Sequence, residues 1–140
     1  MIPSNSACLD TSALIALLNA GKEPDRHRAV LEVYLTFKSS GMVFLPDVAF
    51  AEASAGMPSA RELREALNEI GIESLQANDD ALFLAGKVFL EYRRNSGTKD
   101  GVLPDFIIGA TAVCNGLTLV TFNEKDFVNR FPDLKIVVPS

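Results

Sequence analysis

The segment LPDFIIGATAVCNGLTLVTFNEKDF (residues 103–127) joins a helix pattern directly to a strand pattern. Pro104 and Asp105 are typical of the first turn of a helix, and the Asn-Gly pair at 115–116 is typical of a helix C-terminus. The residues that follow, LTLVT (117–121), are apolar or β-branched, which favours a strand. We therefore predict a helix that leads at once into a buried strand, as in layered α/β folds.

The same alternation extends over the rest of the chain. Short apolar segments predict strands at residues 7–9, 42–45 and 135–138, and apolar periodicity predicts helices over residues 13–20, 26–38, 47–55, 58–70 and 81–92. Because each predicted strand is a short continuous apolar run between helices, we expect a central parallel β-sheet flanked by helices on both faces. The fold class is α/β. Neither a linker nor a repeat divides it, so we expect one domain over residues 1–140.

Composition narrows the possible chemistry. The net charge of −5 lacks the basic footprint of proteins that bind nucleic acid through phosphate contacts alone. The single histidine, His27, and the spacing of Cys8 and Cys114 fit no zinc or histidine-based site. Any metal must therefore be held by oxygen ligands. The N-terminus lacks an export pattern and no apolar run approaches about 20 residues, so we expect a cytoplasmic protein without membrane contact.

Three acidic residues fall where a parallel sheet presents the carboxyl ends of its strands. Asp10 ends the first predicted strand, Asp105 begins a helix that is otherwise almost wholly apolar, and Glu52 lies in mid-helix among alanines. Helix capping alone is an alternative explanation for the two aspartates. Glu52 can cap nothing at its position. We interpret the other candidates as structural caps: Asp47, Asp79, Asp80 and Asp133.

A carboxylate cluster without a histidine base is suited to hard divalent cations. Mg²⁺ and Mn²⁺ prefer oxygen ligands, generate hydroxide and stabilise the charged oxygens of a phosphoryl group. The acidic residues therefore predict a metal-dependent enzyme acting on a phosphodiester. Metal ions would also bridge the acidic protein to its polyanionic substrate.

At these residues the chain resembles the PIN-domain ribonucleases and, among them, the VapC-like toxins of toxin–antitoxin pairs. The resemblance rests on LDTSALIALL (9–18), LPDVAFAEASAG (45–56), the segment 103–127 and FPDLKIVVP (131–139). It implies a PIN-like domain and an endoribonuclease that uses Mg²⁺ or Mn²⁺ to cleave single-stranded or structured RNA. It also assigns catalytic and metal-binding roles, with hydroxyl residues lining the site. The assigned residues are Asp10, Glu52 and Asp105, with Thr11 and Ser12 in support.

The fourth polar position of the family is variable. Here either Asn123, nearer the strand end, or Asp126 can fill it; we favour Asp126 slightly, with Asn123 and Thr121 as supporting residues. Phe122 stands where many members carry a basic residue. The resemblance further implies a homodimer, and a small antitoxin whose C-terminal segment covers the acidic site.

Three other functions are compatible with parts of the pattern. A catalytically silent PIN-like binding module would share the fold, and a DNA nuclease would use the same metals. A phosphoacceptor receiver domain is also α/β with an acidic pocket. It requires a lysine after a late strand, whereas Lys125 follows Asn123 and Glu124 in a predicted helical turn.

Overall fold

The computed structural model describes residues 2–140, so the expected start of the domain at residue 1 lies outside the described residues. Within these described residues, five strands form one parallel sheet in the order β3-β2-β1-β4-β5. The strands are β1 (Ala7–Leu9), β2 (Val43–Pro46), β3 (Ile72–Leu75), β4 (Thr118–Val120) and β5 (Ile136–Val137). The helices are α1 (Thr11–Leu18), α2 (Pro24–Ser40), α3 (Asp47–Ser54), α4 (Ala60–Glu69), α5 (Asp79–Arg94) and α6 (Leu103–Cys114), with a 3-10 turn, η1 (Glu124–Asp126).

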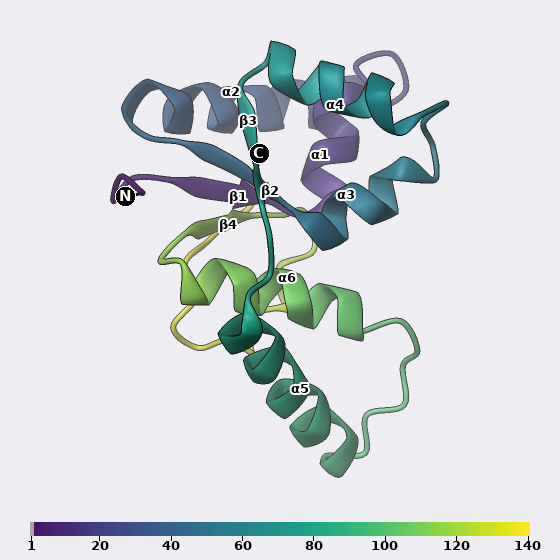
Figure 1. Cartoon of the computed structure of the whole chain (residues 1–140), viewed down its shortest axis with the longest axis vertical. Helices are drawn as coiled ribbons and strands as arrows, with labels where there is room; N and C mark the ends of the chain where they lie inside the picture. Colours follow the sequence, from purple (N-terminus) through teal and green to yellow (C-terminus); the bar gives the residue numbers. More distant parts are fainter. Residues whose placement is uncertain (1) are drawn as a thin grey trace.

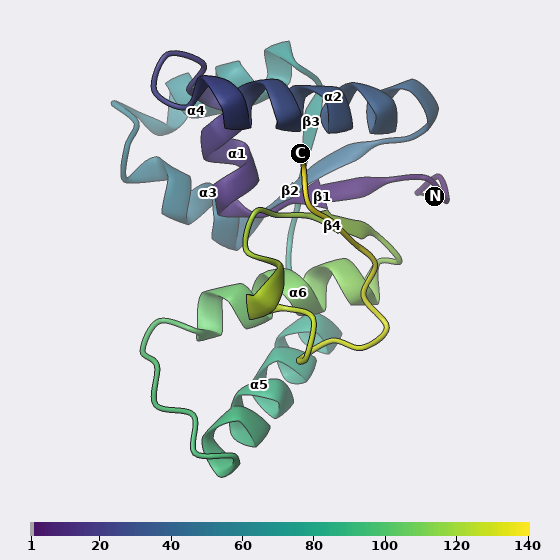
Figure 2. The ribbon, with the colours of Figure 1, turned by 180° about the vertical axis from the view of Figure 1, so that it is seen from behind.

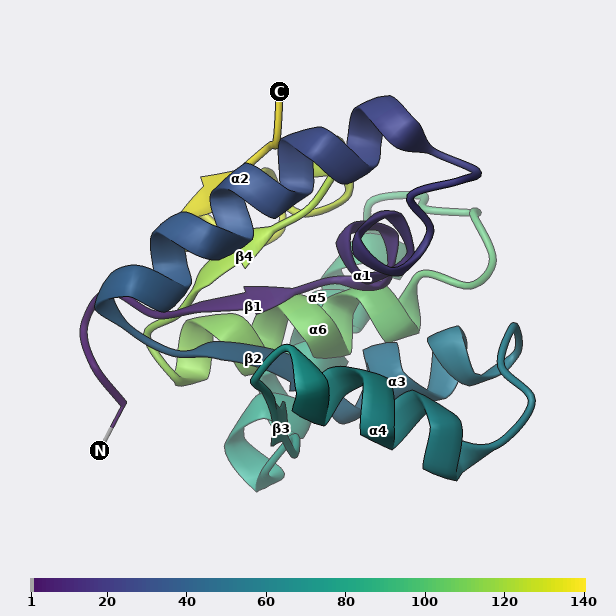
Figure 3. The same cartoon turned by 90° about the horizontal axis from the view of Figure 1, so that it is seen from above.

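The strand order reverses direction at the centre of the sheet. The chain runs from β1 outward through β2 to β3, then returns to the other side of β1 with β4 and β5. Because parallel crossovers are right-handed, such a reversal moves the connecting helices to the opposite face. Figures 1 and 2 show α1, α2 and α4 on one side of the sheet and α5 and α6 on the other. Figure 3 shows β4, β1, β2 and β3 side by side in that order. The predicted α/β fold is confirmed.

The edge strand β3 was not predicted from the sequence. It pairs with β2 through four residue pairs, from Val43 with Ile72 to Pro46 with Leu75. Of its four residues only Ile72 is buried, while Glu73 and Ser74 are exposed. A strand at the edge of a sheet needs no continuous apolar run, and IESL therefore carries little sequence signal.

Several local expectations about helix caps and helix starts were wrong. Asn78, and not Asp79 or Asp80, is the N-cap of α5, because its side chain accepts the Ala81 N–H at 2.9 Å. Asp133 caps no helix, since the described residues after it form only the strand β5.

Asp47 was expected as an N-cap, but Pro46 occupies that position and Asp47 is the first residue of α3, where its carboxylate accepts the Val48 N–H at 2.9 Å. Helix α1 begins at Thr11, before the expected start at residue 13, because Asp10 caps it. The cap brings the hydroxyl residues of the predicted site into the first turn of α1.

The centre of the sheet is fully buried. All three residues of β1 are shielded from solvent, and α6 packs so closely on the C-terminal segment that a side chain at Gly109 would meet the Phe131 ring at 2.5 Å. Because β1 is the buried central strand, the residue that follows it, Asp10, lies in the middle of the edge formed by the carboxyl ends of the strands. Among residues 2–140 no helix is both long and apolar enough to cross a membrane.

Candidate active site

The candidate site lies between the ends of β1 and β4, where the strand order reverses. In open α/β sheets this is the place where ligands bind. Leu9 pairs with Val120, and the Asp10 N–H donates to the Val120 carbonyl at 3.1 Å. The next residues, Asp10 and Thr121, therefore stand side by side, and the Thr121 hydroxyl donates to Asp10 Oδ2.

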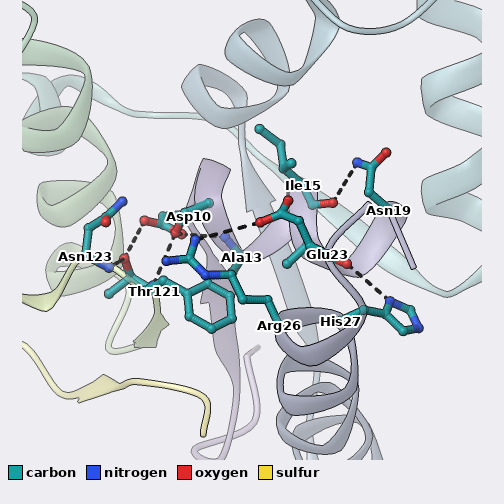
Figure 4. A network of polar contacts seen from close by, with 12 residues as sticks. Asp10, Ala13, Ile15, Asn19, Glu23, Arg26, His27, Thr121 and Asn123 are labelled. Atoms are coloured by element: carbon teal, nitrogen blue, oxygen red, sulfur yellow. Dashed lines mark hydrogen bonds and ion pairs between the residues drawn. The ribbon is translucent and has the colours of Figure 1, made fainter. Parts of the chain in front are cut away.

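The Asp10 side chain is buried and accepts hydrogen bonds from three donors. Its Oδ1 accepts the Ala13 N–H at 2.9 Å and the Ser12 hydroxyl at 2.7 Å, while Oδ2 accepts from Thr121 (Figure 4). The side chain is thus both the N-cap of α1 and part of the candidate site. Burial raises the pKa of Asp10, and the hydrogen bonds oppose that shift because they favour the ionised form. The carboxylate is fixed in one orientation at the sheet edge.

The segment after β4 is tied to the same hydroxyl groups. The Phe122 N–H donates to Ser12 Oγ at 3.2 Å, and the Asn123 N–H donates to Thr121 Oγ1 at 2.9 Å. Arg26, from α2, lies over the Phe122 ring at 4.5 Å from its centroid and pairs with Glu23 at 3.8 Å (Figure 4). A basic residue therefore lies beside position 122, although another element supplies it.

Glu52 reaches the site from the middle of α3. The side chain is exposed, and the Thr11 hydroxyl donates to its Oε1 at 2.5 Å. This contact joins the first turn of α1 to α3, two elements that also pack on each other. Glu52 therefore faces the end of β1 while one side stays open to solvent.

Asp105 is the half-buried member of the cluster. It lies in the first turn of α6, but the N-cap of that helix is Val102 and no side chain caps it, so the capping explanation does not account for Asp105. Burial, followed by repulsion from Asp126, Glu52 and Asp10, raises the pKa of Asp105 to about 6, and Lys99 acts in the opposite direction. Carboxylates from three other segments therefore lie near enough to Asp105 at this edge to repel its negative charge.

The two candidates for the fourth polar position, Asp126 and Asn123, differ in their contacts. Asp126, in η1, is the carboxylate with the strongest repulsive effect on Asp105, and its Oδ1 lies 3.7 Å from Lys99 Nζ. The Asn123 side chain is exposed, and its backbone makes the contact with Thr121. Lys99 lies in the loop between α5 and α6, and its position next to Asp126 depends on the fold.

The donor set fits a hard divalent cation bound partly through water. Within residues 2–140, no three acidic, histidine or cysteine side chains converge closely enough to enclose one ion directly. Mg²⁺, however, retains several waters and binds proteins through one or two carboxylates. The buried Asp10 and the half-buried Asp105 fit this mode, with Glu52 and Asp126 as further oxygen donors.

The sequence matches the family described as the PIN domain over residues 7–131. The chain belongs to the PIN domain family. The match covers β1 to β4 and all four carboxylates of the site. It confirms the resemblance inferred from the sequence motifs. A comparison with curated proteins finds no matching sequence.

Solved structures of toxin–antitoxin proteins share the fold of this PIN domain. A chain of a toxin–antitoxin complex from Klebsiella pneumoniae is 26% identical with a TM-score of 0.69, covering 96% of this chain and 98% of that one. A chain of VapBC-1 from nontypeable Haemophilus influenzae is 19% identical with a TM-score of 0.72, and the match covers 95% of this chain and 97% of that one. VapC20 from Mycobacterium tuberculosis, described as a sarcin–ricin loop cleaving toxin, is 16% identical with a TM-score of 0.57. The match covers 83% of this chain and 87% of that one.

Proposed function

We propose that this PIN domain is a metal-dependent endoribonuclease and the toxin of a toxin–antitoxin pair, acting in the cytoplasm. The observation that carries the proposal is the gathering of Asp10, Glu52, Asp105 and Asp126, from four separate segments, at the point where the strand order reverses. Family membership and the RNA-cleaving activity stated for VapC20 support RNA as the substrate class.

The side chains of the site have distinct tasks in this proposal. Asp10 and Asp105 hold Mg²⁺ or Mn²⁺, with Glu52 and Asp126 completing the oxygen set. The bound ion supplies hydroxide formation and charge stabilisation at the scissile phosphate. Ser12 and Thr121 fix the two oxygens of Asp10 through hydrogen bonds, and Thr11 donates to Oε1 of Glu52. The backbone contact of Asn123 with Thr121 supports this arrangement.

The test is cleavage of matched single-stranded RNA and DNA by the purified chain in Mg²⁺, Mn²⁺ or EDTA. We expect RNA cleavage that needs metal, and a loss of about 100-fold or more in Asp10→Asn and Asp105→Asn. Asp133→Asn is the control, because Asp133 is an exposed carboxylate outside the cluster. Full activity in EDTA contradicts the metal-dependent mechanism, and equal cleavage of DNA contradicts RNA specificity. Absence of cleavage in every condition favours a silent binding module.

The proposed partners are a small antitoxin and a second copy of the chain. A cavity of about 380 Å³ beside Glu52, lined partly by Ile15, Leu18 and Met57, offers an apolar surface to an antitoxin segment next to the acidic site. Phe83 and Leu90 lie on one face of α5 with 68% and 42% of their surface exposed, which is suited to a dimer contact. Co-expression with a candidate small antitoxin and sedimentation of the purified chain test these two contacts.

A further inference from the structure

A small cavity adjoins the acidic site on the side of α6. Its volume is about 160 Å³, and it lies between the loop that joins α5 to α6 and the segment around η1. Asp105 and Asp126 line one part of it, and Lys99, Lys125 and Arg130 line another. Three basic residues from two distant segments therefore meet beside two carboxylates of the proposed site, in a chain with a net charge of −5.

Two of these three basic side chains have no acidic partner. Within residues 2–140, neither Lys125 nor Arg130 has a carboxylate oxygen within 4 Å, and Lys99 reaches Asp126 only at 3.7 Å. Both members of the Lys99–Asp126 pair are partly exposed, at 65% and 24%, so this contact is weak and can exchange for a stronger anion. The cavity therefore carries cationic groups that the folded chain does not neutralise.

The surrounding packing fixes the position of these groups. The Arg130 guanidinium lies over the Tyr92 ring at 5.0 Å, which leaves its N–H edge free to donate to two oxygens of one anion. The Tyr92 hydroxyl accepts the Lys99 N–H at 2.8 Å. The Gly97 N–H donates to the Tyr92 carbonyl at 2.9 Å, and a Cβ at Gly97 would meet the tyrosine ring at 2.5 Å. Tyr92 thus holds both the loop and Arg130 in place.

We propose that this cavity, lined by Lys99, Lys125 and Arg130, binds a backbone phosphate of the RNA next to the scissile one. The inference rests on the proposed ribonuclease function and deepens it, since it places one flank of the substrate strand along α6. An RNA strand whose scissile phosphate lies at the carboxylates has its next phosphate within reach of the adjoining cavity. Lys99 exchanges Asp126 for that phosphate, and Lys125 and Arg130 neutralise its charge.

The test measures the salt dependence of RNA binding with the full-length protein in EDTA, where cleavage does not proceed. Each lost phosphate contact is expected to lower the slope of log K against log salt by about 0.7 for single-stranded RNA. We expect this decrease in Lys125→Gln and Arg130→Gln, and a restored slope in Lys125→Arg. Lys87→Gln is the matched control: it removes one exposed positive charge on α5, where Lys87 lies over the Phe83 ring. Its slope should equal that of wild type.

Neutral linkages locate the contact. One phosphate of the RNA is replaced by a methylphosphonate, at each position in turn. Wild type should bind the RNA more weakly when the replacement is at one position flanking the scissile phosphate, whereas Lys125→Gln should bind that RNA as well as it binds the unmodified RNA. Lys125 lies on an exposed turn, so this variant stays informative if Arg130→Gln folds poorly. The inference is overturned if Lys125→Gln and Arg130→Gln both have the salt-dependence slope of wild type, or if Lys87→Gln lowers the slope as much as they do. In either case the proposed function still stands if wild type cleaves RNA in Mg²⁺. Failure of wild type both to bind and to cleave RNA overturns both.

Discussion

Replacing Asp105 by asparagine should stabilise the metal-free protein. The pKa of Asp105 is raised from 3.8 to about 6, so keeping this group ionised at pH 7 costs at most about 3 kcal/mol, at 1.36 kcal/mol per unit. The carboxyl group is only about half buried, and solvent screening reduces this to roughly 1.5 kcal/mol. Losing a negative charge in the first turn of α6 costs about 0.5 kcal/mol. We therefore expect a net gain of about 1 kcal/mol, or a rise in Tm of about 3 °C.

The gain should depend on pH with a defined sign. Between about pH 4 and 6 the unfolded chain loses the Asp105 proton before the folded chain does, so wild-type stability falls as pH rises through this window. Below pH 4 both states hold the proton, and the advantage of Asp105→Asn should vanish. Thermal and urea unfolding in EDTA at pH 4 and 7 measure both values.

The matched control is Asp79→Asn, which removes an exposed first-turn aspartate from α5. It loses the same interaction with the helix terminus without relieving any crowding, so it should be slightly less stable than wild type at pH 7. If Asp105→Asn is destabilised as much as Asp79→Asn, or if its advantage is the same at both pH values, the carboxylates do not repel one another as described.

Three further outcomes are expected. Glu52→Gln should abolish RNA cleavage while Asp47→Asn retains most of it, because Glu52 receives the Thr11 hydroxyl at the site and Asp47 lies at the start of α3; the reverse pattern in cleavage assays would refute this assignment. Asp126→Asn should lower the cleavage rate by at least tenfold and Asn123→Ala by less than threefold, since Asp126 is the carboxylate that acts most strongly on Asp105; comparable losses in both would leave no basis for preferring Asp126. Thr121→Val, nearly isosteric, should lower the free energy of unfolding by about 1–3 kcal/mol at pH 7, because the buried carboxyl group of Asp10 loses a hydrogen-bond donor; unchanged urea denaturation would show that this hydrogen bond contributes nothing.

Local sequence signals were sufficient for the layered fold and for selecting three of the carboxylates that the structure places at the same edge of the sheet. The residues next to Asp10 predict a strand that ends there, and the residues next to Asp105 predict a helix that starts nearby. Once the fold class is known, both aspartates are expected at the edge of the sheet. Glu52 was recognisable because a mid-helix carboxylate among alanines has no capping role. The edge strand β3 has no apolar run that predicts a strand, because only Ile72 of its residues is buried.

Contacts between distant segments were beyond sequence reasoning. The choice between Asn123 and Asp126 depends on how η1 turns toward α6, which neighbouring residues do not reveal. Arg26 comes to lie beside Phe122 through the packing of α2, and its sequence neighbourhood gives no sign of it. The cavity with Lys99, Lys125 and Arg130 likewise forms only when two segments meet.

The central claim is that the carboxylates at the sheet edge form a metal site and are not merely helix caps. Calorimetric titration of the purified chain with Mn²⁺ at pH 7 tests it directly. We predict saturable binding by wild type and by Asp133→Asn, and binding at least tenfold weaker in Asp10→Asn and Asp105→Asn, because each loses an anionic ligand. Equal Mn²⁺ affinity in all four proteins, or no binding by wild type, would contradict the account.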